Sequence, residues 1–525
     1  MASKEHDQLL FKFNSKSSYD SIEKIKPESI RSRSDHESRQ IGIVSAIFLI
    51  FNRMVGTGIF ATPSTIYKLS GSAGLSLVLW VVGSVIAASG LMVYLEFGTA
   101  IPKNGGEKNY LEFVYRKPKF LVTAMFASYT CLLGWAGSNS VVFGQYILNA
   151  VNVPIDRFNQ RLVGLCCITF AFLIHSTAMK WGLRLQNALG LIKLFIILII
   201  IFSGFAALAG HINIDQQPDT LQRGFEGTTG SAYSVVTALY NVIWSFIGYS
   251  NANYALGETK NPERTLRIAA PTALGLVSAF YILINIAYFA AVPGEEMANS
   301  GTIIAAKYFR NVFGLSAERV LSVFIALSAL GNVMAVIFTH GRVVQELAKE
   351  GIIPFSSLFA SNLPFNAPFM GLFEHWLMAI IIMLAPPPGD AYNFIVNLIA
   401  YPLSVVNMFV ALGLIYIYIH GNEFEWQPKI RASLPVAVFF CASNLYLIAA
   451  PFVSPDSSNQ NVYQSLPYYL HAIVGIGIFA LGAVYWFIWC IVLPHLGGYI
   501  LERRQVIGSD GHVRNQFFRK QVKAG

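Results

Sequence analysis

Long apolar segments alternate with short polar connections along most of this chain. Most of these segments hold about 20 residues or more, the length at which an α-helix crosses the ~30 Å hydrocarbon core of a bilayer. They predict an all-α, multi-pass membrane protein with twelve transmembrane helices, whose connections are too short to form a soluble domain. The predicted spans are residues 41–68, 73–99, 120–150, 161–179, 182–209, 232–255, 267–292, 317–340, 369–386, 391–419, 432–453 and 467–494.

The composition agrees with this pattern. Hydrophobic residues make up 54% of the 525 residues and charged residues only 12%, and the mean hydropathy is +0.52. A soluble protein of this size could not cover its surface with so few charges. The composition therefore excludes a soluble enzyme, a disordered scaffold and a nucleic-acid-binding protein, in spite of the net charge of +9.

The distribution of positive charge predicts the orientation. If the termini and every second connection face the cytoplasm, that side carries 28 Lys and Arg residues and the opposite side carries 7. The positive-inside rule therefore places both termini in the cytoplasm. Residues 1–40 are polar and lack an apolar stretch, so they are predicted to form a disordered tail rather than a cleaved signal. Residues 498–525 are predicted to be a cytoplasmic C-terminal tail.

Two predicted spans contain residues that interrupt an α-helix. In the first span Gly56, Thr57 and Gly58 lie halfway along the apolar segment, and in the sixth span residues 244–251 form an unusually polar midsection. Glycines in membrane helices can simply allow close packing. Two interruptions in spans five helices apart favour instead a pair of broken helices, the feature that marks the substrate site of many secondary transporters.

The backbone of two such breaks has a definite chemistry. A half-helix that begins near Gly58 presents N–H groups and a partial positive charge suited to a carboxylate. A half-helix that ends near Ile247 presents carbonyl oxygens suited to an ammonium group. Together they would bind the zwitterionic end of an amino acid with few charged side chains.

Lys193 lies inside the fifth predicted span, about twelve residues or ~18 Å from its start. A charge at that depth is costly and marks a functional site, although a long side chain near a helix end can reach the interface. Such an amine could exchange a proton, or it could fill with its own charge a place where another transporter holds sodium. Lys193 is therefore the candidate coupling residue.

The sequence contains no HExxH, Walker loop, haem motif or zinc-spaced cysteine cluster. We therefore predict no enzyme activity, no cofactor and no bound metal.

Several motifs surround these residues. The Gly56–Phe60 break, the string YLEFGTAIP at 94–102 and Glu258 with Asn261-Pro262 resemble the amino acid–polyamine–organocation superfamily, and within it the L-type amino acid transporters. Longer strings, among them AIPKNGGEKNYLE and VIWSFIGYSNANYALGETKNPERTL, are similar to the fungal high-affinity methionine permeases along nearly the whole membrane portion. The resemblance implies a fold of two inverted five-helix repeats with broken helices 1 and 6, plus two extra helices.

The same resemblance divides the chain and suggests its activity. Residues 41–419 would form the ten-helix transport core and residues 420–497 helices 11 and 12. The implied activity is import of L-methionine, and of related neutral amino acids such as cysteine, by proton symport with alternating access across the plasma membrane. The alternatives are an uncoupled exchanger of neutral amino acids and an amino acid-sensing receptor of the same fold. Tails of only about 40 and 30 residues favour transport over sensing.

Position by position, the resemblance also implies a binding site. The substrate carboxylate would bind at Thr57 and Gly58, with Gly56 allowing the turn. The amine would bind the carbonyls of Met54, Trp244 and Ile247, and Trp244 would close over the substrate as an aromatic gate.

The remaining implied residues lie in the fifth, sixth and eighth spans. In the family that the chain resembles, a pair of glycines commonly follows the gate, and in this sequence the pair is Ile247-Gly248, with a single glycine. Ser328 and Asn332 would lie beside the coupling site and the side-chain pocket, and Lys193 would take the place of sodium.

The resemblance further suggests partners besides methionine, a proton and the lipid bilayer. Ubiquitination machinery would act on lysines of the N-terminal tail, namely Lys4, Lys12, Lys16, Lys24 and Lys26. The connection 151–160 lacks the cysteine through which L-type light chains bind a heavy chain, so no disulfide-linked heavy chain is expected.

Overall fold

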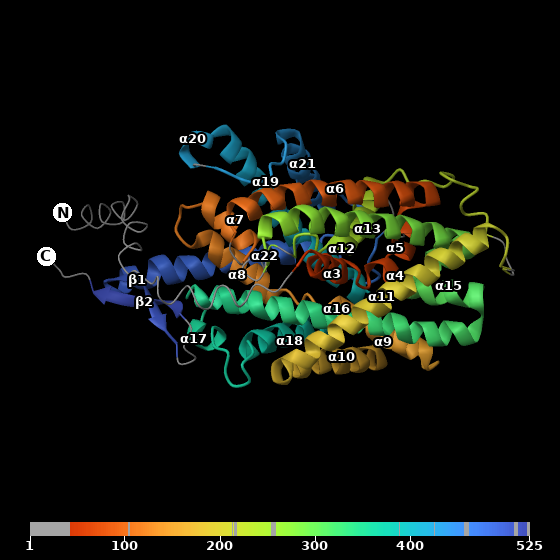
Figure 1. The fold of residues 1–525 in the computed structure, drawn as a ribbon, viewed down its shortest axis with the longest axis horizontal. Helices are drawn as coiled ribbons and strands as arrows, with labels where there is room; N and C mark the ends of the chain where they lie inside the picture. The colour runs from red at the N-terminus through yellow and green to blue at the C-terminus, as the bar shows by residue number, and fades with distance from the viewer. Residues whose placement is uncertain are drawn as a thin grey trace.

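The computed structural model describes residues 42–521 apart from 103–104, 213, 215–217, 252, 254–258, 388, 425, 456–460 and 509–512. The N-terminal tail and its five candidate lysines lie outside the described residues. The structure is dominated by long helices that run roughly parallel to the long axis of the molecule (Figure 1).

Among the described residues, ten helical segments are long and apolar enough to cross a membrane. They are α3–α4 (Ile43–Ala61), α6 (Ala73–Ala100), α8–α9 (Leu121–Ala150), α10 (Arg157–Thr177), α11 (Met179–Leu208), α13 (Pro262–Ala291), α16 (Leu315–Lys349), α19 (Ala391–Ile419), α21 with η3 (Leu434–Phe452) and α22–α23 (Leu470–Gly497). Two shorter apolar helices, α12 (Ala232–Phe246) and α18 (Phe369–Leu384), coincide with the sixth and ninth predicted spans. The multi-pass helical fold is thus confirmed, and the count of twelve spans stays a prediction.

The connections contain short helices at the two ends of the bundle. At one end lie α7 (Glu107–Val114), α17 (Ser356–Phe359) and α20 (Gly421–Phe424), all in connections predicted to be cytoplasmic (Figure 1). At the other end α15 (Ile304–Phe313) follows α14 (Gly294–Asn299) and η2 (Gly301–Ile303) in a connection predicted to face outward. The connections that the distribution of Lys and Arg assigns to one side of the membrane therefore lie at one end of the bundle, and the connection assigned to the other side lies at the opposite end.

Local sequence explains where several helices start and stop. The Ser72 side chain accepts a hydrogen bond from the Leu75 N–H at the start of α6, and Asp156 caps α10 through the Asn159 N–H. These side chains satisfy N–H groups that have no partner inside the helix. At the other end of α5 (Pro63–Ser70), Gly71 takes a left-handed conformation with φ of 78°, which glycine adopts without strain.

The first and sixth spans are interrupted where the sequence predicts. Helix α3 ends at Met54, α4 begins at Gly58, and α12 ends at Phe246. A third interruption, which the sequence analysis did not predict, divides the third span between α8 (Leu121–Leu132) and α9 (Gly137–Ala150). At this break a Cβ atom on Gly134 would lie 2.7 Å from the Ala379 Cα of α18, so the bare glycine backbone lets the two helices touch.

The segment predicted as the C-terminal tail contains two β-strands, which the sequence analysis did not predict. Strands β1 (Tyr499–Ile507) and β2 (Val513–Gln521) pair antiparallel in register Arg503 to Phe517. Phe517 packs against Trp489 and Phe120, with ring centroids 4.8 and 5.3 Å apart. Residues 499–521 lack the regular alternation of apolar and polar residues that predicts a β-strand, so the sequence pattern did not indicate this hairpin.

Candidate functional site

The two predicted helix breaks meet in the interior of the bundle. A Cβ atom on Gly58 would lie only 2.9 Å from the Ser245 Cα, so the backbones of the first and sixth spans touch there. Thr62, one turn further along, lies 3.4 Å from the Ser245 hydroxyl. Glycine at position 58 is therefore required for packing as well as for access to the backbone.

A tyrosine from the seventh span joins the two breaks. The Tyr281 hydroxyl lies 2.9 Å from both the Met54 and the Ser245 carbonyl oxygens. Both carbonyls belong to the last turns of interrupted helices, where carbonyl groups lack intrahelical partners. The Tyr281 side chain is fully buried, so this hydroxyl fixes the relative position of the two half-helices in a water-poor interior.

A chain of polar side chains crosses the first break. The Thr57 hydroxyl donates to Asn139 Oδ1 at 2.5 Å, and Asn139 Nδ2 donates to Asn332 Oδ1 at 2.8 Å. Asn332 Nδ2 in turn donates to the Arg53 carbonyl at 3.2 Å. A Cβ atom on Gly56 would lie 2.5 Å from Asn332 Nδ2. The third and eighth spans therefore hold the interrupted segment through side-chain amides.

Lys193 is buried against the same break. Its ammonium donates to the carbonyl oxygens of Asn52 at 3.1 Å and Val55 at 2.8 Å, and only 1% of the residue is exposed. On its other side, Gly331 of α16 leaves the space that the lysine stem occupies. A cation thus stabilises carbonyls at the end of α3, the position at which the partial charge of a helix is negative.

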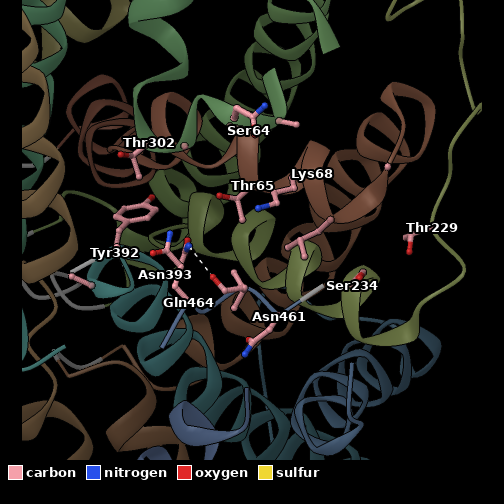
Figure 2. Close-up of a pocket in the computed structure, with 18 of the residues that line it drawn as sticks. Ser64, Thr65, Lys68, Thr229, Ser234, Thr302, Tyr392, Asn393, Asn461 and Gln464 are labelled. Carbon is pink, nitrogen blue, oxygen red and sulfur yellow. Dashed lines mark hydrogen bonds between the residues drawn. The ribbon is translucent and has the colours of Figure 1, made fainter. Parts of the chain in front are cut away.

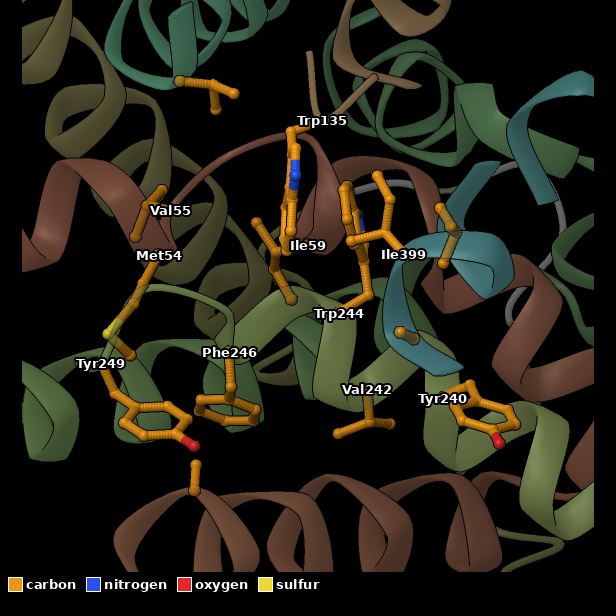
Figure 3. Close-up of a cluster of buried hydrophobic side chains, with 14 of the residues drawn as sticks. Met54, Val55, Ile59, Trp135, Tyr240, Val242, Trp244, Phe246, Tyr249 and Ile399 are labelled. Atoms are coloured by element: carbon orange, nitrogen blue, oxygen red, sulfur yellow. The ribbon is translucent and has the colours of Figure 1, made fainter. Parts of the chain in front are cut away.

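Aromatic and aliphatic side chains surround these backbone groups. Figure 3 shows Trp244, Ile59 and Ile399 gathered beside Trp135 from the break in the third span. Trp244 is 8% exposed and Trp135 is 4% exposed. The breaks therefore adjoin an apolar compartment in which a thioether side chain would pack favourably.

A wide polar cavity of about 790 Å³ opens from the side of α14 and α15 toward this compartment (Figure 2). Tyr392 of α19 is among the lining residues and is 3% exposed, and its hydroxyl has the side chains of Thr57 and Trp244 as neighbours. Tyr392 thus links the cavity lining to residues of the two breaks.

The opposite side is nearly closed. The cavity there measures about 50 Å³ and is bordered by Arg53, Trp135, Gly248 and His340. A Cβ atom on Gly248 would lie 2.5 Å from the Arg53 Cγ, and Gly248 has a φ of +121°. Glycine at this position therefore permits both the backbone conformation after the break and the close approach of Arg53.

The structure brings together most of the site residues expected from sequence. Met54, Gly56, Thr57, Gly58, Trp244, Ile247 and Gly248 form or adjoin the two breaks, and Asn332 and Lys193 bond to the first. Ser328 lies one turn before Asn332 and is fully buried, but its hydroxyl makes no hydrogen bond among the described residues. It is the one expected residue that no hydrogen bond ties to a break in the described part of the chain.

Four residues were missed, namely Asn139, Tyr281, Tyr392 and Trp135. Asn139 stands among the small and polar residues 134–140 in an apolar span, which is a signal that sequence reasoning could have used. Tyr281 and Tyr392 have no such signal, because the chain contains 24 tyrosines and only the packing of the spans selects these two.

This arrangement of broken helices inside a multi-pass bundle defines a membrane transport protein. The family model described as amino acid permease matches residues 41–479, and the chain therefore belongs to the amino acid permease family. It is accordingly a transporter of amino acids and not an enzyme.

Among its relatives, the high-affinity methionine permease of Saccharomyces cerevisiae is 50% identical over 483 residues, which cover 91% of this chain and 84% of the relative. The low-affinity methionine permease of the same yeast is 32% identical over 515 residues, covering 96% and 92%. The b(0,+)-type amino acid transporter 1 of Mus musculus is 28% identical over 423 residues, covering 79% and 83%.

Proposed function

We propose that this permease imports L-methionine across the plasma membrane by proton symport and alternating access. The observation that carries the proposal is the meeting of two broken helices beside an apolar compartment, with a polar cavity whose lining includes Tyr392, a neighbour of Thr57 and Trp244. The printed names of the two yeast relatives support methionine as the substrate. Related neutral amino acids such as cysteine are the natural competitors.

The substrate would lie across the two breaks. Its carboxylate would approach the backbone at Thr57 and Gly58, where α4 begins. Its ammonium would face the carbonyls of Met54, Trp244 and Ile247. The Met54 carbonyl already accepts bonds from Tyr281 and from the Gly56 N–H, and the Trp244 carbonyl accepts the Ile247 N–H. A carbonyl oxygen has two lone pairs and accepts about two hydrogen bonds. Because the Met54 carbonyl already accepts two bonds and the Trp244 carbonyl accepts one, we expect the Ile247 carbonyl to be the principal acceptor for the ammonium.

Lys193 supports coupling without sodium. Its ammonium already occupies a position against carbonyls of the first break, and a second cation there would be repelled strongly at low dielectric. A proton gradient is then the driving force that remains for concentrative uptake.

Alternating access is supported by the difference between the two cavities. One side presents about 790 Å³ and the other about 50 Å³, as expected for a conformation open to one side only. In the orientation predicted from charge, the open side is extracellular. Movement of Trp244 over bound substrate would then close this side before the other opens.

The test is uptake of labelled methionine into proteoliposomes that contain the purified protein. We expect uptake that is accelerated by an inward proton gradient, abolished by a protonophore and unchanged when sodium is replaced by choline. Norleucine, which replaces the sulfur by a methylene group, should compete less well than its similar size suggests. Uptake that requires internal amino acid and ignores the proton gradient would identify an uncoupled exchanger. Specific binding without uptake would identify a receptor.

Two further elements of the proposal concern the cell. The charge bias supports cytoplasmic termini, and the resemblance supports residence in the plasma membrane. Ubiquitination of Lys4, Lys12, Lys16, Lys24 or Lys26 would regulate the amount of permease there. Replacing all five with Arg should slow removal of the permease from the cell surface without changing the KM for methionine.

A further inference from the structure

The wide polar cavity is lined by more hydrogen-bonding groups than a simple access route for the substrate requires. Its lining includes carboxamides from four helices and one connection, together with hydroxyls and glycine backbone. Figure 2 shows Lys68 and Thr65 on one side of the cavity and Asn393, Gln464 and Asn461 across from them. A ligand with several polar groups would therefore find donors and acceptors on more than one wall.

Lys68 is the single charged residue among the described residues that line the cavity. It lies in the last turn of α5, and its ammonium makes no ion pair or hydrogen bond within the described part of the chain. Asp390, the neighbour of the lining residue Gly389, is fully buried. Its carboxylate accepts the N–H groups of Gln464 and Ser465 at 2.6 and 2.8 Å. Among the described residues that line the cavity, the charge is therefore that of Lys68 alone.

Lys68 lies on the same side of the molecule as the cavity but well away from the first helix break. Lys68 belongs to the same half-helix segment that begins at Gly58 and continues through Thr62 into α5. It lies nearly three turns beyond the first break, about 15 Å along the helix axis at 1.5 Å per residue. This separation exceeds the reach of a lysine side chain plus its hydrogen bond, so one carboxylate contacts Lys68 and the backbone near Gly58 in succession rather than at once.

We propose that this cavity is a second, outer binding site, in which Lys68 captures the α-carboxylate of an amino acid before it reaches the helix breaks. The amides and hydroxyls around Lys68 accommodate the ammonium of the zwitterion. A cationic amino acid, whose side chain adds a second positive charge, is disfavoured in the same cavity. The outer site thus contributes to selection for neutral amino acids, and this inference rests on the proposed uptake of methionine from that side.

The first test is kinetic and uses the full-length protein in cells or oriented proteoliposomes. Lys68→Gln should raise the KM for methionine about two- to fivefold, the range expected for a partly exposed charge pair, and leave Vmax unchanged. Lys68→Arg should restore the parental KM. Lys307→Gln is the matched control, because Lys307 lies at the same end of the bundle but does not line the cavity. An unchanged KM in Lys68→Gln, or an equal loss of Vmax in both Lys68 variants, would overturn the outer site.

The second test does not depend on transport. Acetylation of lysines by an N-hydroxysuccinimide ester is measured by mass spectrometry on the purified protein. Methionine and 4-(methylthio)butanoate, which retains the carboxylate, should protect Lys68 but not Lys307. Methioninol, which lacks the carboxylate, should protect neither lysine.

The two tests separate the two proposals. Protection of Lys68 in a protein that takes up no methionine would preserve the outer site and refute the proposed function. Normal uptake without protection and without a change in KM would refute only the outer site.

Discussion

The Tyr281 hydroxyl contacts the Met54 carbonyl and the Ser245 carbonyl at the same distance, 2.9 Å. One side chain from the seventh span therefore links the interrupted first and sixth spans. A hydroxyl has a single hydrogen, so it is shared between the two carbonyls or alternates between them. This contact couples the two half-helices that must move relative to each other when a transporter changes conformation.

Removing this hydroxyl tests its role directly. Tyr281→Phe keeps the ring and its packing with Trp80 and Phe246 but leaves two buried carbonyls without their shared donor. We expect a loss of about 1–3 kcal/mol in stability, typical of an unsatisfied buried group, and a lower Vmax for uptake. Thermal unfolding of the detergent-solubilised protein and initial uptake rates measure the two effects. Tyr288→Phe, whose hydroxyl makes only a 3.4 Å contact to Ile59, is the matched control and should change both quantities less.

The amide of Asn139 is expected to hold the first break in shape. Asn139→Leu has a similar volume but breaks the bonds to both Thr57 and Asn332. We predict at least a severalfold rise in the KM for methionine, because the backbone near Thr57 loses its fixed position. On the same helix, Asn149→Leu removes only bonds to Glu318 and Ser322 and serves as the control. Equal KM values in the two variants would contradict a role for Asn139 in the site.

Trp244 is predicted to act as a gate rather than only as a packing residue. Trp244→Ala removes the indole that lies beside Ile59 and Trp135 (Figure 3). Methionine should then bind more weakly and dissociate faster, with Trp244→Phe intermediate. Stopped-flow or filter-binding measurements of the dissociation rate provide the comparison. A parental dissociation rate in Trp244→Ala would show that the indole only fills space.

Lys193 gives the sharpest prediction about coupling. Lys193→Met retains the length of the side chain but leaves the Asn52 and Val55 carbonyls without a cation. We expect concentrative uptake to be abolished, whereas binding persists because the substrate contacts are backbone groups of other residues. Lys193→Arg keeps the charge, and any concentrative uptake that it retains should remain independent of sodium. Accumulation against a gradient by Lys193→Met would refute the assignment of Lys193 as the coupling residue.

The C-terminal hairpin is predicted to be docked rather than free. Phe517 packs between Trp489 and Phe120, and Arg503 pairs with Glu350 at the end of α16, which also accepts Lys108 of α7 at 2.9 Å. Phe517→Ala should release the hairpin and expose residues 499–521 to limited proteolysis. Phe518, the next residue, points to the opposite face and packs under Arg504, so Phe518→Ala should leave the protease resistance nearly unchanged.

The sequence by itself determined the bundle and the places where its helices break. Apolar runs long enough to cross a bilayer specify helices wherever they are placed, because unpaired backbone groups are too costly in hydrocarbon. Gly56, Gly58 and Gly248 mark the breaks through a local property, the absence of a side chain. Lys193 is conspicuous for a local reason too, since a charge inside an apolar span is rare.

Tertiary structure decided which side chains serve these breaks. Asn139, Tyr281 and Tyr392 come from spans three, seven and ten, and the identities of their partners depend on helix rotation and depth, which an apolar pattern does not specify. The same holds for the pairing of Lys193 with the Asn52 and Val55 carbonyls. The hairpin escaped the sequence analysis for a related reason: a two-stranded ribbon is marginal alone, and Phe517 is stabilised by aromatic partners that are about 30 and 400 residues away in the chain.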